Sequence, residues 1–263
     1  KKCKIGDGIN EIFKAIVQSE ETVFVVPNYC DYPNSNFFLF NERSCGFFNG
    51  NKDLMNRYLN IPKKFIVVSN SCNNSFKTAF SYHLSSDATP NILYFNSKKF
   101  DQNPLDGKLM SNKEAEHLVY DFLSNRYEFE ESAMAIVFYK QKVLATVEEV
   151  YDRPTLSLPK GHIEPGETKL DAAIRECFEE TNEIITKDNF IGDLKPFDIT
   201  FISHQNKLIK KTIYPLIFRV DKMGNLKAKE ERIRKVKYLN IGEFLLKCTY
   251  ENVKTMIMEA TCK

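Results

Sequence analysis

The stretch GHIEPGETKLDAAIRECFEETNE, residues 161–183, decides the fold of the second half of this chain. Thr168 is suited to cap a helix, with Asp171 at the third helical position. The apolar residues that follow at helical spacing are Leu170, Ala173, Ile174 and Cys177. We therefore predict an amphipathic helix that packs an apolar stripe against a sheet.

Three glutamates of this predicted helix, Glu176, Glu179 and Glu180, lie at positions i, i+3 and i+4. At this spacing their side chains converge on one patch, where each exposed pair of like charges costs about 0.2–0.5 kcal/mol. One interpretation is a solvated acidic face beside Arg175. The other is a bound divalent cation, because carboxylate oxygens are the ligands that Mg²⁺ and Mn²⁺ prefer.

The loop before the helix favours the cation. Gly161 follows Pro159-Lys160 and Gly166 follows Pro165, so the backbone changes direction twice within a few residues. A glycine at 161 allows a main-chain carbonyl to approach an ion or a phosphate closely. Glu167 precedes Arg175 by eight positions, and a guanidinium can hold its carboxylate through two hydrogen bonds, which ties loop to helix.

These residues resemble the Nudix box, G-x5-E-x7-R-E-U-x-E-E-x-G-U, in which U is an apolar residue. The matching positions are Gly161, Glu167, Arg175, Glu176, Cys177, Glu179 and Glu180. Two positions differ: Asn182 replaces the closing glycine and Glu183 the last apolar residue. Asparagine tolerates the left-handed conformation of a helix end, so the first change is mild. The second suggests that the chain leaves the helix by a slightly shifted path.

The resemblance implies a mixed sheet between helices over residues 129–263 and hydrolysis of a nucleoside diphosphate linked to a further group. In this family the residues that match Glu176, Glu179 and Glu180 hold Mg²⁺ or Mn²⁺, together with a backbone carbonyl, here that of Lys160. Glu167 and Arg175 match its structural ion pair. The base that activates water is a box glutamate or one from a later loop, which here is Glu230 or Glu231.

For the substrate, the string LPKGHIEPGE is similar to that of diadenosine tetraphosphate hydrolases, where the matching lysine lies near phosphates. We therefore expect Lys160, Gly161 and His162 to contact a small nucleotide, with a dinucleoside polyphosphate favoured. Alternatives are an RNA cap pyrophosphohydrolase and a nucleotide-sensing regulator. The intact carboxylates count against a purely binding role. Cys177 is expected to be buried and inert.

Composition excludes several other classes. No stretch approaches the roughly 18 apolar residues that a membrane span needs. Seven cysteines without a C-x-x-C pair indicate free thiols, as in a reducing cytosol. The net charge of +2 is too small for a nucleic-acid footprint over the whole chain, so RNA is not a favoured partner. The mixed-charge run KAKEERIRKVK, residues 227–237, is expected to be a solvated hairpin or helix face unless a phosphate site lies next to it.

The first half differs in style, and we predict a separate α/β domain of unassigned role over residues 1–128. Residues 9–19 have helical spacing, and TVFVV, FFLF, FIVV and ILYF are expected as short strands. A helix is expected over residues 112–125, capped by Ser111. In the second half, two hairpins are expected, within residues 133–147 and 197–220, and one or two helices near the carboxyl end. The predicted fold class is α/β (α+β).

Overall fold

The computed structural model describes residues 6, 8–29, 32–69, 80, 82–84, 91–102, 106–150, 153–248 and 250–263. The chain forms two compact units, one of residues 1–128 and 200–209 and the other of residues 129–199 and 210–263. Three of the seven cysteines, Cys3, Cys30 and Cys72, lie outside the described residues. No helix in the described ranges combines the length and apolar character that crossing a bilayer requires.

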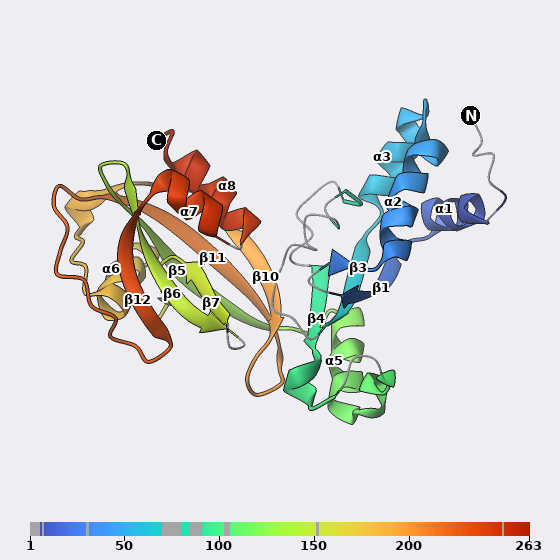
Figure 1. Ribbon diagram of the computed structural model, residues 1–263, viewed down its shortest axis with the longest axis horizontal. Coiled ribbons are helices and arrows are strands. Elements are labelled where there is room, and N and C mark those ends of the chain that lie inside the picture. Colours follow the sequence, from blue (N-terminus) through green and yellow to red (C-terminus); the bar gives the residue numbers. More distant parts are fainter. Residues whose placement is uncertain are drawn as a thin grey trace. The chain divides into compact units, whose positions relative to one another are not determined.

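The second unit contains a sheet of eight strands in which β10, β11, β5, β6 and β12 are neighbours in that order (Figure 1). Three short strands extend it, since β7 pairs with β6, β8 with β5 and β9 with β11. The strands are β5 (Glu128–Tyr139), β6 (Lys142–Val150), β7 (Arg153–Ser157), β8 (Lys160–His162), β9 (Phe190–Asp193), β10 (Phe197–Ile202), β11 (Leu208–Arg219) and β12 (Ile233–Asn240). The helices are α6 (Lys169–Thr181), α7 (Ile241–Lys247) and α8 (Glu251–Ala260), with a 3₁₀ turn, η5 (Lys187–Asn189).

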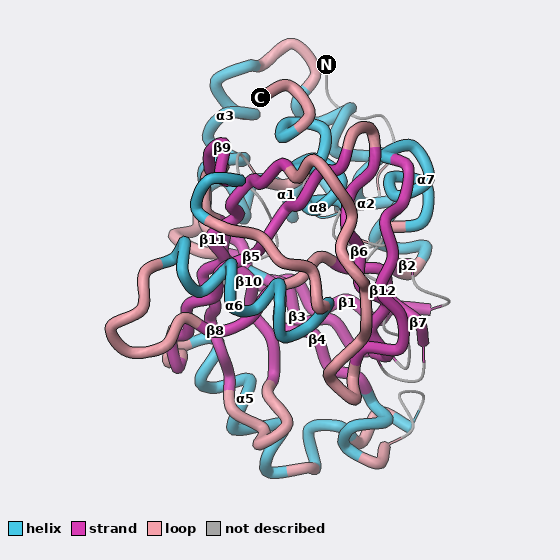
Figure 2. Tube along the Cα trace, turned by 90° about the vertical axis from the view of Figure 1, so that its left-hand side faces the viewer, coloured by secondary structure: helices cyan, strands magenta, loops and turns pink. Residues whose placement is uncertain are grey.

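Strand β5 is buried on both faces, which explains its continuous apolar run. Met134, Ile136 and Phe138 pack with buried residues of α7 and α8. Ala133, Ala135 and Val137 pack on the other face with Ala172, Ala173 and Cys177 of α6. The sheet therefore lies between helices, as the family resemblance implied (Figures 1 and 2).

The hairpins predicted in this half are confirmed. β5 and β6 join through a tight turn in which Lys140 has φ 51°, and β10 and β11 are neighbours in the sheet. The carboxyl end forms two helices, α7 and α8, separated at Cys248.

The first unit contains a sheet of four strands in the order β2, β1, β3, β4, in which the pairs β1–β3 and β3–β4 are parallel. The strands are β1 (Thr22–Tyr29), β2 (Tyr32–Pro33), β3 (Lys63–Ser69) and β4 (Ile92–Asn96). The helices are α1 (Ile9–Gln18), α2 (Ser35–Phe48), α3 (Lys52–Asn60) and α5 (Lys113–Leu123), with 3₁₀ turns η2 (Ser97–Phe100) and η4 (Leu109–Ser111).

Two local predictions for this half were wrong. FFLF, residues 37–40, lies in helix α2, which Asn34 caps by accepting a hydrogen bond from the Phe37 amide. A short apolar run fits a buried helix as well as a strand, and the cap decides here. The predicted helix 112–125 is α5, but its cap is Asn112, which accepts from the amides of Glu114 and Ala115. Ser111 instead ends the 3₁₀ turn η4.

The first unit also contains a buried histidine, and its environment predicts that the stability of the fold depends on pH. His83 is 1% exposed, its Nδ1 lies 2.6 Å from the Tyr58 hydroxyl, and its Nε2 meets the Asn41 amide oxygen. Burial, with a smaller contribution from the Lys63 ammonium, lowers the pKa of His83 from 6.5 to about 4.

We expect the free energy of unfolding to fall as the pH drops from 6.5 to about 4. In this window the unfolded imidazole binds a proton and the folded one does not, which gives a slope of about 1.4 kcal/mol per pH unit. Urea unfolding at a series of pH values measures the slope. His83→Gln is expected to flatten it, and equal slopes for the variant and wild type would contradict this assignment.

Candidate active site

Helix α6 begins and ends as the sequence predicts. The Thr168 hydroxyl accepts a hydrogen bond from the Asp171 amide at 3.1 Å and donates to its carboxylate at 2.6 Å. At the other end Asn182 adopts φ 59°, in the left-handed region. The helix therefore holds its three glutamates at fixed positions beside β8 (Figure 2).

Arg175 joins the loop to the helix. Its Nε and Nη2 donate to the two carboxylate oxygens of Glu167, each at 2.9 Å, which is the expected bidentate pair. Its Nη1 donates to Glu176 at 2.7 Å and to Glu179 at 3.0 Å, and Nη2 also donates to the His162 carbonyl. These bonds raise the pKa of Arg175, the pair with Glu167 contributing most, and hold the pKa of Glu167 below its usual value. One guanidinium thus orients three carboxylates.

Gly161 is required by the close approach of Glu176. A Cβ atom at position 161 would lie 1.9 Å from the Glu176 carboxyl carbon, far inside van der Waals contact. The sequence suggested instead that this glycine admits a carbonyl to an ion. In the structure the absence of a side chain leaves room for the Glu176 carboxylate, which is only 8% exposed.

Three carboxylates converge on one point. One oxygen from each of Glu176, Glu180 and Glu230 lies within 4.8 Å of the others. Such an all-oxygen set suits Mg²⁺ or Mn²⁺. Glu230 is one of the two later-loop glutamates that the resemblance suggested as the general base, and the other, Glu231, is exposed. Glu179, with a side chain 49% exposed, lies on the outer side of this group and pairs with Arg175.

Glu180 is the most deeply buried of these carboxylates, with no exposed surface. Burial raises the pKa of Glu180 to about 8, although the positive charges of Lys160 and Arg232 act to lower it. Its oxygens accept a hydrogen bond from the Lys160 amide at 3.1 Å and one from the Arg232 guanidinium. A divalent cation bound here would favour the ionised form of this carboxylate.

Glu148 and Arg232 are two site residues that the sequence did not reveal. Glu148 accepts from the Lys160 ammonium at 2.8 Å, and its second oxygen lies 3.7 Å from Arg232. Burial acts to raise the pKa of Glu148, but Lys160 and Arg232 outweigh it and lower the pKa. The sequence signal that could have pointed to Glu148 was the acidic pair that follows the apolar strand segment KVLAT. Arg232 lay within the run expected to be a solvated face.

Of the residues expected to contact substrate, two have charged partners. The Lys160 ammonium donates to Ser157 at 3.0 Å as well as to Glu148. His162 is exposed, and its Nε2 lies 2.9 Å from the Glu130 carboxylate and 3.1 Å from the Lys211 ammonium. Both side chains therefore lie in clusters of charged residues next to helix α6. Their contact with a substrate stays a prediction.

The departure at position 183 has a specific structural reason. Glu183 is 2% exposed, and its carboxylate accepts two bonds from the Gly224 amide, at 3.0 and 3.1 Å, and one from the Tyr238 hydroxyl. Asn182 also donates to the Asn225 carbonyl at 2.7 Å. The segment that leads to Glu230 is therefore hydrogen-bonded to the end of α6.

Four of the cysteines, Cys45, Cys177, Cys248 and Cys262, lie among the described residues, and none of these four forms a disulfide. Cys177 is fully buried on the sheet-facing side of α6, and burial raises its pKa to about 12. This thiol is too protonated near neutral pH to act as a nucleophile.

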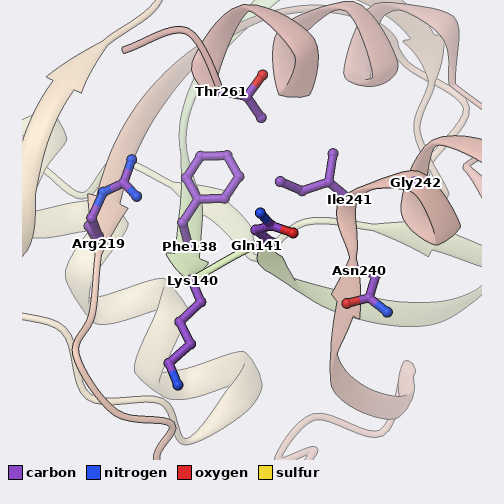
Figure 3. A pocket seen from close by; sticks show the side chains of 8 residues that line it. All are labelled: Phe138, Lys140, Gln141, Arg219, Asn240, Ile241, Gly242 and Thr261. Atoms are coloured by element: carbon purple, nitrogen blue, oxygen red, sulfur yellow. The ribbon is translucent and has the colours of Figure 1, made fainter.

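A pocket of about 520 Å³ lies in the second unit, away from these carboxylates, between the β5–β6 turn, the start of α7 and the end of α8 (Figure 3). Phe138, Ile241 and Thr261 face it, whereas the Lys140 side chain points away. None of the predicted site residues lines this pocket.

Comparison with known proteins identifies related domains. A model of the NUDIX domain matches residues 129–259. The "Probable DHNTP pyrophosphohydrolase" of Lactococcus lactis subsp. cremoris (strain MG1363) is 41% identical over 76 residues. That match covers 29% of this chain and 45% of the relative, so it spans less than half of the relative's length.

Solved structures of low sequence identity also match the second half. A NUDIX hydrolase from Nitrosomonas europaea has 19% identity and a TM-score of 0.39, covering 51% of this chain and 88% of its own. The C. elegans Ap4A hydrolase has 18% identity and a TM-score of 0.38, with 51% and 96% covered. The E. coli dihydroneopterin triphosphate pyrophosphohydrolase has 16% identity and a TM-score of 0.43, with 51% and 95% covered.

Proposed function

The chain belongs to the Nudix family through residues 129–259, and from this premise we propose that it is a metal-dependent pyrophosphohydrolase acting on a nucleotide-like diphosphate. The observation that carries the proposal is the convergence of Glu176, Glu180 and Glu230 within 4.8 Å. Three carboxylates at this distance repel one another unless cations neutralise them. The residues present therefore fit Mg²⁺ or Mn²⁺.

Glu176, Glu180 and Glu230 would hold the ion, with the Lys160 carbonyl as a further candidate ligand. When bound, such an ion neutralises phosphate oxygens and lowers the pKa of water. The protein's own contribution is positioning. Arg175 fixes Glu167, Glu176 and Glu179, and the buried surroundings of Glu180 exclude water from one side of the site.

The candidates for the general base are a box glutamate and the later-loop glutamate. Glu179 is a box carboxylate with an exposed side chain, so it can meet water. Glu230 lies within the group of converging oxygens, which favours it as a ligand. We therefore propose Glu179 as the base and Glu230 as a ligand.

For the substrate, we propose a small molecule that carries a chain of two or more phosphates. A dinucleoside polyphosphate is the first candidate, from the LPKGHIEPGE string. Dihydroneopterin triphosphate is the second, because the Lactococcus relative is named for it. Both share the anhydride bond. Capped RNA is a less favoured alternative, since the chain has a net charge of only +2.

The test is hydrolysis of a panel in the presence of Mg²⁺ or Mn²⁺, with products separated by ion-exchange chromatography. The panel contains diadenosine tetraphosphate, dihydroneopterin triphosphate, a nucleoside diphosphate sugar and capped RNA. Metal-dependent product from at least one of them supports the proposal, and the identity of that substrate selects among the candidates. Absence of product from all four, or equal rates with chelator, would contradict it.

We further propose that residues 1–128 and 129–263 are separate domains, the first of unassigned role. The two compact units support a division near residue 128, although residues 200–209, from the β10–β11 hairpin, group with the first unit.

A further inference from the structure

Arg232 lies among the carboxylates of the candidate metal site. Its Nη2 donates to Glu180, its Nε donates to Glu230 at 2.6 Å, and its Nη1 lies 3.7 Å from Glu148. Two of these partners, Glu180 and Glu230, also belong to the converging carboxylate group. The guanidinium therefore neutralises the same charges that a divalent cation would neutralise.

We propose that Arg232 is a counter-ion of Glu180 and Glu230 that competes with a divalent cation for these two carboxylates, and that its guanidinium, when released from them, binds a substrate phosphate. This inference rests on the proposed function. It assigns Arg232 a role in substrate binding and couples that role to metal occupancy.

The geometry favours movement of Arg232 over movement of Glu180. Glu180 is fully buried and its other oxygen is held by the Lys160 amide, so it cannot turn away freely. The Arg232 side chain is 47% exposed and stands on a turn closed by a bond from the Ile233 amide to the Glu230 carbonyl. An exposed arginine can swing through its side-chain torsions while the backbone of the turn stays in place.

The position of Glu148 indicates where the Arg232 guanidinium would lie after it leaves Glu180 and Glu230. Glu148 is bound by the Lys160 ammonium at 2.8 Å and lies 3.7 Å from Arg232. Two cations around one carboxylate leave a net charge of +1, directly beside the proposed metal ligands. A substrate phosphate beside these residues would accept hydrogen bonds from both cations, and the planar guanidinium would bind it through two parallel hydrogen bonds.

The decisive experiment measures the two functions of Arg232 separately. Mn²⁺ affinity is measured without substrate, from the electron paramagnetic resonance signal of free Mn²⁺. Arg232→Ala is expected to tighten Mn²⁺ binding roughly three- to tenfold, because one competing positive charge is removed.

The same variant is expected to raise the KM for whichever panel substrate the wild type hydrolyses by roughly tenfold, since a charged phosphate contact is lost. Replacing a residue that only stabilised the fold would not tighten Mn²⁺ binding and at the same time raise the KM for the substrate. Arg232→Gln removes the charge with less change in shape and serves if the alanine variant is poorly folded. Lys235→Ala, an exposed basic residue of β12, gives the same change in net charge and is the matched control.

Tighter Mn²⁺ binding together with a higher KM supports the inference. Unchanged or weaker Mn²⁺ binding by Arg232→Ala, in a wild type that binds Mn²⁺ and hydrolyses substrate, would overturn the counter-ion role alone. An unchanged KM would overturn the phosphate contact. A wild type that neither binds Mn²⁺ nor hydrolyses any panel substrate would instead overturn the proposed function.

Discussion

Replacing Glu180 by glutamine is expected to reduce kcat/KM by at least about a hundredfold, because removal of one charged ligand from a preorganised site costs several kcal/mol of transition-state stabilisation. The fold should persist. The amide oxygen of glutamine can still accept the hydrogen bond from the Lys160 amide, and the variant removes a carboxyl group whose ionised form is disfavoured by burial. The melting temperature without metal should therefore not fall.

Steady-state kinetics and thermal melting of the same preparation test this expectation. Glu164→Gln is the matched control, since Glu164 is an exposed glutamate of the loop before α6 whose backbone amide, not its carboxylate, contacts Glu167. The double variant Glu179→Gln/Glu180→Gln should be at least as inactive as Glu180→Gln. Turnover at the wild-type level in the double variant would refute the metal assignment.

Replacing Gly161 by alanine is expected to cost about a hundredfold in turnover, because displacement of a catalytic group by about 1 Å has an effect of this size. The added Cβ would lie 1.9 Å from the Glu176 carboxyl carbon, so the carboxylate must leave its place beside Glu180. Its bond to Arg175 at 2.7 Å would be disturbed as well. Mn²⁺ affinity should fall together with turnover.

Gly242→Ala provides the control, because a Cβ at position 242 meets no atom within 4 Å and the substitution is of the same type. Its turnover and Mn²⁺ affinity should match those of the wild type. Wild-type kinetics for Gly161→Ala would show that Glu176 is not needed where the structure places it, and the carboxylate group would then need a different interpretation.

The sequence by itself determined those parts of the site that depend on neighbours within a few positions. The Thr168 cap, the left-handed Asn182, the apolar side of α6 with Cys177 and the bidentate Glu167–Arg175 pair all follow from local geometry. Helix periodicity and capping act over three or four residues, and the loop pair spans eight. The family resemblance rests on this same short stretch.

Where several local signals compete, the sequence was less decisive. The run FFLF satisfied the pattern of a buried strand, and only the cap at Asn34 and the burial of Phe37 and Phe48 place it in α2. Likewise Ser111 and Asn112 both suit a helix cap, and the 3₁₀ turn that precedes α5 leaves that role to Asn112.

The tertiary structure decided which residues from distant parts of the chain lie beside the glutamates of helix α6. Ile233 of β12 pairs with Glu148 of β6, so the adjacent Arg232 comes close to a carboxylate more than eighty positions earlier in the chain. The reason for Gly161 is likewise the position of Glu176 on a different element. Strand register depends on the packing of whole faces of the sheet, and a slip of one residue would point every side chain of β12 to the other face. No local pattern around residue 232 contains that information, which is why its place in the site emerged only from the fold.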